Sequence, residues 1–375
     1  MSEIEGKAQI IASQLMRARN AIGLSSVEAS NRLNIDDVIL NAWEEGREFP
    51  DAEELYEIAT VYRRPIVYFY EETKEERMPL DLRMGKGTPG YINSKIREGL
   101  RQFEQYCELQ WELEEVMNKK RTVDVVSATL DDDLESLAST IREKLEYFGG
   151  RRNNFKRLRR IFNEHGIKVF GLSLPEEIDG ASLWHETYGP AILINITFSQ
   201  PRTFFTLAHE YSHLMLFAKD KAESSVLCDL NDELKVERFC NRFASAFLIP
   251  IQEFKTYLHE RYLNVANFYD INVLSDIAHD FKVSRHVVAI RLEELGVVDK
   301  GFYWKIKDQL KEVKPPFTRR GKEWKRKKEK IFGEYYTNLA LDAYKLGNLT
   351  NASLSKHMDL RLSQLGELLK AESVN

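Results

Sequence analysis

The composition of the chain is that of an ordinary folded protein. Its 375 residues are 43% hydrophobic and 30% charged, include 19 Gly and 10 Pro, and carry a formal net charge of −5. These values exclude a disordered, collagen-like or low-complexity chain. At roughly 150 residues per domain, the length allows two or three domains, each large enough for its own core.

No stretch of the sequence is apolar over the length that a membrane helix needs. The most apolar runs are residues 192–196 and 243–249, whereas a spanning helix needs about 20 residues. The cysteines Cys107, Cys228 and Cys240 show no paired spacing, which fits a reducing compartment and predicts neither a disulfide framework nor a cysteine-based zinc site. We therefore expect a cytoplasmic protein without a membrane partner.

The first seventy residues predict a bundle of short helices. Ser25 and Glu28 have the spacing of a capping box at one helix start. Apolar residues recur at helical spacing in five segments: 8–21, 25–33, 36–45, 51–61 and 65–70. Residues 1–70 contain 7 Lys/Arg and 12 Asp/Glu, a local balance of 7 − 12 = −5. The bundle therefore holds the whole acidic surplus of the chain.

The remainder predicts a mostly helical α+β protein with one small sheet. A charged, then Pro- and Gly-containing stretch over 71–90 indicates a linker, and a long charged helix is expected over 92–120. Short β-rich pieces follow at 167–172, 181–185 and 191–196, then helices at 202–218 and 232–248, a helical stretch to 296 and a last helical segment over 322–372. Pro250 ends the second of the two helices.

A metal-binding pattern lies in the first of these two helices. The segment TLAHEYSHLML contains H-E-x-x-H inside an apolar run. Positions i and i+4 share one helix face, so His209 and His213 can present ring nitrogens to one ion. Glu210 lies beside that pair, where its carboxylate can accept a proton from a water molecule that the ion activates.

The third protein ligand of such a centre is expected in the second helix. A catalytic zinc normally has three protein ligands and one open position. Glu237 is the favoured candidate, because its helix is apolar on the other face, and Asn241 lies one turn further on, where it can orient a ligand. The alternatives are Asp229, Asp232 and Glu233.

These segments carry a resemblance to a known family. TLAHEYSHLML, ERFCNRFASAFLIP and the preceding IDGASLWHETYGPAILINITF resemble the ImmA/IrrE zinc metallopeptidases over roughly residues 135–300. The resemblance implies that His209, His213 and Glu237 bind Zn²⁺, with Mn²⁺ as the alternative ion, and that Glu210 is the general base. It also implies a protein substrate, a transcriptional repressor. Ser212 and Cys240 stand where the family commonly has Gly and Ala, and both are expected to be packing residues.

The β-rich segment before the motif suggests how a substrate is held. It predicts two strands joined by a polar hairpin, and an edge strand of this sheet is expected to bind the substrate backbone by strand addition. His185 and Tyr188 are candidates for donating a hydrogen bond to the reaction oxyanion. The alternative is that both are exposed loop residues.

The N-terminal bundle resembles repressor-type (XRE-like) helix-turn-helix domains, with Ala29, Trp43-Glu44-x-Gly46 and Pro50 as landmarks. DNA is therefore one candidate partner. However, Asp36 and Asp37 would lead the recognition helix, and carboxylates facing phosphates oppose binding. Protein docking or homodimerisation is the favoured role.

Two further segments have nucleic-acid-binding features. Residues 277–296 have helix-turn-helix spacing, but packing on the peptidase core is the favoured interpretation. The basic segment 319–330 surrounds Trp324 and is a candidate nucleic-acid contact, but a solvated helix face is the favoured interpretation. Its candidate nucleic-acid contacts are Arg319, Arg320, Lys325, Arg326 and Lys327.

The sequence thus predicts a zinc endopeptidase that cleaves a protein substrate, a repressor or a partner encoded nearby, in bacterial or mobile-element regulation. The alternative is a non-proteolytic DNA-binding regulator or an antitoxin-like binding protein. The expected divisions are 1–72 for a five-helix helix-turn-helix domain, 73–130 for a linker and long connecting helix, 131–258 for a zincin-like peptidase domain, 259–300 for a helix-turn-helix-like segment packed on it, and 301–375 for a C-terminal helical region.

Overall fold

A computed structural model describes most of the chain. The described residues are 3–21, 24–62, 69, 80–84, 94–148, 154–176, 178–218, 230–262, 267–310 and 323–372. Contacts divide the chain into two compact units: the first comprises Met1–Met78, Lys86–Glu108 and Ser173–Glu177, and the second Pro79–Gly85, Leu109–Leu172 and Ile178–Asn375.

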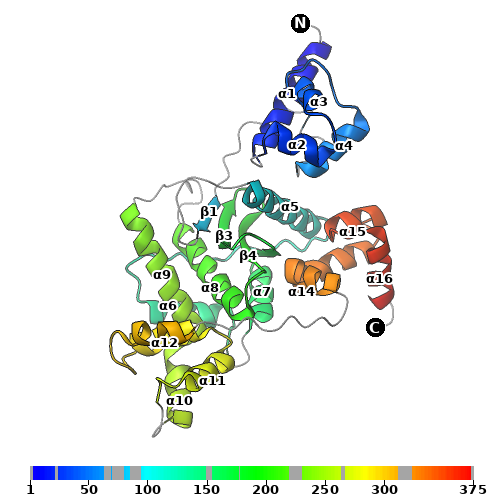
Figure 1. The fold of residues 1–375 in the computed structure, drawn as a ribbon. Helices are drawn as coiled ribbons and strands as arrows, with labels where there is room; N and C mark the ends of the chain where they lie inside the picture. Colours follow the sequence, from blue (N-terminus) through cyan, green and yellow to red (C-terminus); the bar gives the residue numbers. More distant parts are fainter. Residues whose placement is uncertain are drawn as a thin grey trace. The chain divides into compact units, whose positions relative to one another are not determined.

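The first unit begins with short helices around a small apolar core. These are α1 (Glu3–Ala21), α2 (Ser26–Leu33), α3 (Asp37–Glu44) and α4 (Ala52–Val61), blue in Figure 1. The predicted capping box is present at the start of α2, where the Ser25 side chain accepts from the Glu28 backbone N–H and the Glu28 carboxylate accepts from the Ser25 N–H. Leu15, Leu40 and Trp43 are in the core. The predicted fifth helix, 65–70, lies outside the described residues apart from buried Phe69.

The turn between α2 and α3 is formed by three residues. Asn34 has a left-handed backbone conformation with φ 56°, and Asp36 caps α3 by accepting a hydrogen bond from the Val38 backbone N–H. Asn tolerates this conformation better than most residues because its short side chain can hydrogen-bond locally. Helix α5 (Ser94–Val116) follows later in the chain and corresponds to the predicted long helix.

The second unit is built on a four-stranded sheet in the order β1-β3-β4-β2. The strands are β1 (Leu80–Met84), β2 (Lys168–Leu172), β3 (Ile178–His185) and β4 (Gly189–Asn195). The β1–β3 and β3–β4 pairs are antiparallel, and β2 pairs with β4 in parallel. The mostly helical α+β architecture predicted from the sequence is confirmed for the described residues.

Strand β1 was not expected, because it lies in the segment that the sequence indicates as a linker. Its presence changes the role of the predicted hairpin, which is β3–β4. Both hairpin strands are internal, and the sheet edges are β1 and β2. The expectation that the hairpin offers a free edge to a substrate is therefore wrong, because β1 already pairs along β3 from Ile178 to Leu183.

Helices cover the sheet and extend its core. Strands β2 and β4 are buried along almost their whole length. Helix α8 (Gln200–Phe217) packs against β3 and β4 and against α9 (Leu230–Leu248) (Figure 1). The remaining helices up to residue 310 are α6 (Leu134–Lys144), α7 (Phe155–Glu164), α10 (Ile251–Tyr262), α11 (Ile271–Phe281), α12 (Arg285–Glu294), α13 (Phe302–Ile306) and the 3-10 helix η3 (Lys307–Leu310).

The predicted helix-turn-helix-like segment contributes to the same core as the sheet. Leu274 of α11 and Val288 and Leu292 of α12 are fully buried in the cluster that also contains Leu207 of α8 and Ile192 of β4. Within the described residues, this single apolar cluster extends from Ala128 to Leu310.

The C-terminal helices are α14 (Glu323–Lys345), α15 (Asn351–His357) and α16 (Leu362–Glu372). Helix α14 is kinked at Gly333, whose φ of 71° favours glycine. The buried Arg159 of α7 occupies the kink and donates hydrogen bonds to the carbonyls of Lys330 and Ile331 and to the Val169 carbonyl of β2. Among the described residues, no helix is long and apolar enough to cross a membrane.

Candidate metal centre

The H-E-x-x-H segment lies in the most deeply buried part of α8. All residues from 206 to 215 are buried, because the helix is enclosed by the sheet and α9. The aromatic rings of Phe205, His209, His213 and Phe217 follow one another at four-residue spacing along one face, with the two histidine centroids 4.9 Å apart and the His213 ring stacked on Phe217. This packing restricts the orientation of both imidazoles.

The structure brings three predicted ligands together. The Nε2 atoms of His209 and His213 are 3.1 Å apart. A carboxylate oxygen of Glu237 on α9 lies 3.6 Å from His209 Nε2, and the other lies 3.2 Å from His213 Nε2. Helices α8 and α9 therefore bring their three donor atoms close together.

The three donor atoms fit a tetrahedral ion. Zinc binds nitrogen and carboxylate oxygen at about 2.0–2.2 Å, so two ligands of a tetrahedral centre lie about 3.3–3.6 Å apart. The observed separations of 3.1, 3.6 and 3.2 Å are close to this range. Two imidazoles and a carboxylate are also the ligand chemistry of many catalytic zinc sites.

The ionisation of these groups reflects their mutual contact. Burial alone would raise the pKa of Glu237, but hydrogen bonds from His209 and His213 outweigh it and place the pKa well below its usual range. Burial alone would lower the pKa of His213, yet its contacts with Cys240, Glu237 and Glu210 raise the pKa well above 6.5. In this cluster, a proton on His213 therefore competes with a metal ion for the same nitrogen.

Glu210 lies on the side of α8 that faces the sheet. Its side chain is fully buried, and a carboxylate oxygen lies 3.0 Å from the position that a Cβ atom would occupy on Gly180 of β3. A side chain on β3 at this point would displace the carboxylate, so glycine leaves the space that Glu210 fills. A buried carboxylate next to a metal centre has the chemistry of a general base.

Two buried arginines hold the C-terminal end of α9. Arg142 of α6 donates to the Phe247 carbonyl at 2.8 Å and pairs with Glu253. Arg291 of α12 donates to the Ile249 carbonyl at 3.1 Å and makes a two-pronged ion pair with Glu135 at 2.6 and 2.8 Å. Cationic donors suit the negative end of a helix, whose last carbonyls have no partner within the helix.

The remaining predicted site residues lie in different places. Asn241 is half-buried one turn beyond Glu237 on α9. His185 at the end of β3 and Tyr188 in the following turn stack on each other, with ring centroids 3.8 Å apart. Tyr188 is buried, so the alternative of an exposed loop residue is wrong for Tyr188. At about 3.3 Å per residue, His185 is roughly 16 Å along β3 from Gly180, where the strand meets Glu210. Their contact with a reaction oxyanion stays a prediction.

The side chains of the predicted nucleic-acid contacts lie outside the described part of the chain. Arg319 and Arg320 lie outside the described residues. Lys325, Arg326 and Lys327 belong to the backbone of α14, but their side chains are outside the described part of the chain. The alternative ligand Asp229 is also outside it, as are the side chains of Asp232 and Glu233.

Sequence reasoning missed one residue that lies beside the candidate metal centre. The thiol of Cys240 and the ring nitrogens of His209 and His213 all lie within 4.8 Å of one another, and the three residues are buried. Cys240 follows Glu237 by three positions, which places both on one helix face. That spacing is the available signal in the sequence, and the expected packing role also holds, because Cys240 is buried in the apolar core.

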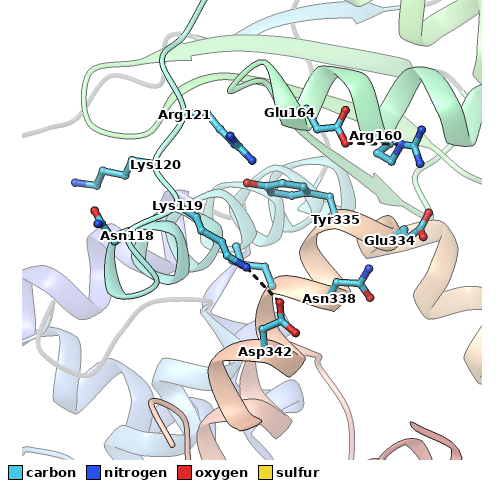
Figure 2. A pocket seen from close by; sticks show the side chains of 11 residues that line it. Asn118, Lys119, Lys120, Arg121, Arg160, Glu164, Glu334, Tyr335, Asn338 and Asp342 are labelled. Carbon is cyan, nitrogen blue, oxygen red and sulfur yellow. Dashed lines mark hydrogen bonds and ion pairs between the residues drawn. The ribbon is translucent and has the colours of Figure 1, made fainter. Parts of the chain in front are cut away.

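A separate pocket of about 480 Å³ lies between the end of α5, α7 and α14, and none of the metal-centre residues lines it (Figure 2). Its charged groups include pairs of opposite sign, with Lys119 3.2 Å from Asp342 and Arg160 3.8 Å from Glu164. The lining as a whole contains four basic and three acidic side chains.

Comparison with known proteins matches a family model to the region that contains the H-E-x-x-H segment. Residues 162–293 match the family model Peptidase_M78, described as the IrrE N-terminal-like domain. No curated protein matches the chain. A solved structure of a Mycobacterium tuberculosis transcriptional regulator is similar at 17% identity and a TM-score of 0.32, covering 51% of each chain, so this chain spans about half the length of that structure. The region from α7 to α12, which holds the candidate metal centre, is thus similar to metallopeptidases of the ImmA/IrrE type.

Proposed function

We propose that this chain is a zinc-dependent endopeptidase, with Mn²⁺ as the alternative ion. The observation that supports it is the convergence of His209, His213 and Glu237, with the buried Glu210 carboxylate on the same helix. The proposed substrate is a protein, namely a transcriptional repressor or a partner encoded nearby. This substrate class rests on the similarity to ImmA/IrrE peptidases.

In the proposed hydrolysis, three side chains bind the ion and Glu210 transfers the proton. When bound, the ion supplies Lewis-acid activation of water and polarises the scissile carbonyl. His209, His213 and Glu237 hold it and fix its position between α8 and α9. Glu210 accepts the proton of the attacking water on its carboxylate and then delivers that proton to the nitrogen of the leaving amine. Burial of Glu210 excludes bulk water from this transfer.

A glutamine substitution separates the chemistry from metal binding. Glu210→Gln keeps the size of the side chain but cannot accept the proton, so we expect loss of about 10²- to 10⁴-fold in peptidase rate with unchanged zinc content. Glu260→Gln, at an exposed position of α10, is the matched control and should keep full activity. Hydrolysis by Glu210→Gln at the wild-type rate would exclude Glu210 as the base.

The same variant can identify the substrate. An inactive enzyme that still binds holds its substrate without cutting it, so Glu210→Gln should co-purify with a protein encoded by a neighbouring gene. Wild-type enzyme with added zinc or manganese should then cleave that protein at one mapped site. Retention of the partner without cleavage by the metal-loaded wild type would favour the alternative, a non-proteolytic, antitoxin-like binding protein.

For the first unit, we propose docking of a protein, including a second copy of this chain, over binding of DNA. Three arginines of this unit are engaged with acids: Arg19 is 2.7 Å from Glu44, Arg32 is 2.9 Å from Glu98, and Arg47 is 2.6 Å from Glu45. Cations that neutralise carboxylates contribute less to the release of counterions from DNA, which supplies most non-specific affinity.

The first turn of α3 supports the same proposal. Val38 is 68% and Ile39 39% exposed, and Asp36 and Asp37 lie next to them. An acidic and apolar surface suits a protein partner better than phosphates. The full-length chain should bind its own promoter duplex no tighter than about 10⁻⁶ M at physiological salt. Specific binding near 10⁻⁸ M would instead favour a DNA-bound regulator, and sedimentation of Val38→Asp beside the wild type tests homodimerisation.

A further inference from the structure

Cys240 lies against the candidate metal centre and has no role in the function proposed above. It projects from α9 three residues after Glu237, is fully buried, and lies in a cluster with His209 and His213 whose donor atoms are all within 4.8 Å of one another. A side-chain hydrogen bond links Cys240 and His213. The thiol is therefore in contact with the ligand set.

The distances allow the sulfur to become a ligand with little movement. Zinc binds thiolate sulfur at about 2.3 Å and imidazole nitrogen at about 2.0–2.1 Å, so sulfur and nitrogen in one tetrahedral centre lie about 3.5 Å apart. The cluster has an upper limit of 4.8 Å for the same separation. Both Glu237 and Cys240 belong to α9, so the helix offers the histidine pair an oxygen and a sulfur donor. With both bound, the attacking water takes a fifth position, because catalytic zinc can expand to five ligands.

The two α9 donors differ in their surroundings. The Glu237 side chain is 32% exposed, whereas Cys240 is fully buried and packed in the apolar core. A donor on the buried side is fixed by packing, whereas a partly exposed carboxylate is restrained by fewer neighbours. Of the two, Cys240 is the better-fixed donor.

We propose that the Cys240 thiolate is a protein donor of this metal centre and makes the centre selective for Zn²⁺ over Mn²⁺. This proposal rests on the metal centre proposed above. On binding, the thiol releases its proton to solvent, and a sulfur lone pair forms the bond to the ion; no group is oxidised or reduced. Thiolate ligands select zinc, whereas manganese prefers carboxylate, carbonyl and water oxygens.

Cobalt titration of the metal-free, full-length protein tests this assignment. Thiolate coordination of Co²⁺ gives an intense charge-transfer band in the near ultraviolet, in addition to the visible bands of a tetrahedral centre. We expect this band in the wild type and its loss in Cys240→Ala, with the visible bands retained. Cys240→Ser, which is nearly isosteric, must lose the band in the same way, so an unfolded alanine variant does not end the test. Cys107→Ala and Cys228→Ser are matched controls and should keep the band.

A competition titration between Zn²⁺ and Mn²⁺ measures the selectivity. Loss of an outer-shell partner typically costs about 10- to 100-fold in metal affinity, so loss of a direct donor should cost at least that much for zinc. The affinity of Cys240→Ala for Mn²⁺ should change much less, and the zinc-to-manganese preference should therefore fall by about the same factor.

The failures of the two proposals give different results. A charge-transfer band that survives in Cys240→Ser, or wild-type cobalt spectra that show only nitrogen and oxygen ligands and are lost in His209→Ala, would overturn the role of Cys240 and leave the metal centre standing. Cobalt that does not bind the wild type, or binds His209→Ala equally well, would overturn the metal centre and the cysteine assignment together.

Discussion

Substitution of Gly180 by alanine should displace the Glu210 carboxylate without touching a metal ligand. An added Cβ would lie 2.7 Å from Thr206 Cγ2, 2.9 Å from the Leu193 carbonyl oxygen and 3.0 Å from Glu210 Oε1. All three separations are shorter than the 3.4 Å at which ordinary contact begins. Gly180 does not have a positive φ, so the backbone accepts alanine and the contacts alone determine the effect.

The neighbours differ in how easily they can move. The Leu193 carbonyl belongs to the backbone of β4, and Thr206 is held by the hydrogen bond of its hydroxyl to the Arg202 carbonyl at 2.9 Å. Only the Glu210 carboxylate is at the end of a flexible side chain. A shift of about 1 Å in a reacting group can cost about 10²-fold in rate, and overpacking of a buried site costs about 1–3 kcal/mol of stability.

We therefore expect Gly180→Ala to lower kcat/KM about 100-fold, reduce the free energy of unfolding by about 1–3 kcal/mol, and keep its zinc. The measurements are peptide hydrolysis, urea unfolding and metal analysis on the same preparation. Gly366→Ala in α16, where a Cβ meets nothing within 4 Å, is the control and should keep wild-type activity. Full activity of Gly180→Ala despite the expected loss of stability would refute the placement of Glu210 as the catalytic base.

Three further predictions concern the ligands and the buried polar groups. His209→Ala or His213→Ala should lower zinc content from about one ion per chain to near zero by elemental analysis, since loss of one imidazole leaves an incomplete and weak site; full occupancy would exclude that histidine. Burial and the nearby Lys356 charge lower the pKa of His357 from 6.5 to about 4, so the unfolded chain takes up the proton first as the pH falls. Stability should then decrease between about pH 6.5 and pH 4 by at most about 3 kcal/mol, and His357→Gln should remove this part of the pH dependence in urea unfolding. Arg159→Leu leaves buried carbonyls without their donor, at about 1–3 kcal/mol each, so calorimetry should show a loss of at least about 3 kcal/mol, against at most about 1 kcal/mol for the exposed Arg160→Leu.

The parts of the site that the sequence predicts are those with a local spacing. His209, Glu210 and His213 lie within one helical turn, so their shared location follows from helix geometry alone. Glu237 required one further step, namely that α9 is an apolar helix ending at Pro250 and therefore packs in the core. The structure places all four residues between α8, α9 and β3.

The parts that sequence reasoning missed depend on long-range contacts. Strand β1 is five residues long and carries Asp81 and Arg83 in an otherwise charged segment, so only its pairing with β3 defines it as a strand. Cys240 has a helical spacing from Glu237, but its approach to the histidines depends on the distance between two helices. In the last segment, predicted as helical over 322–372, the kink and the two breaks coincide with the positive φ of Gly333, Gly347 and Asp359.

Helix α12, in the helix-turn-helix-like segment, contacts the end of the helix that carries Glu237. Glu237 and Cys240 both project from α9, so the position of α9 relative to α8 sets the donor distances of 3.2 and 3.6 Å between Glu237 and the histidines. Arg291 of α12 and Arg142 of α6 fix the end of that helix through its last carbonyls. A recognition helix must expose its polar face to a groove, whereas α12 buries Arg291 to hold α9. Helix α12 is thus part of the scaffold that positions the candidate ligands, as expected for a segment whose favoured interpretation is packing on the peptidase core.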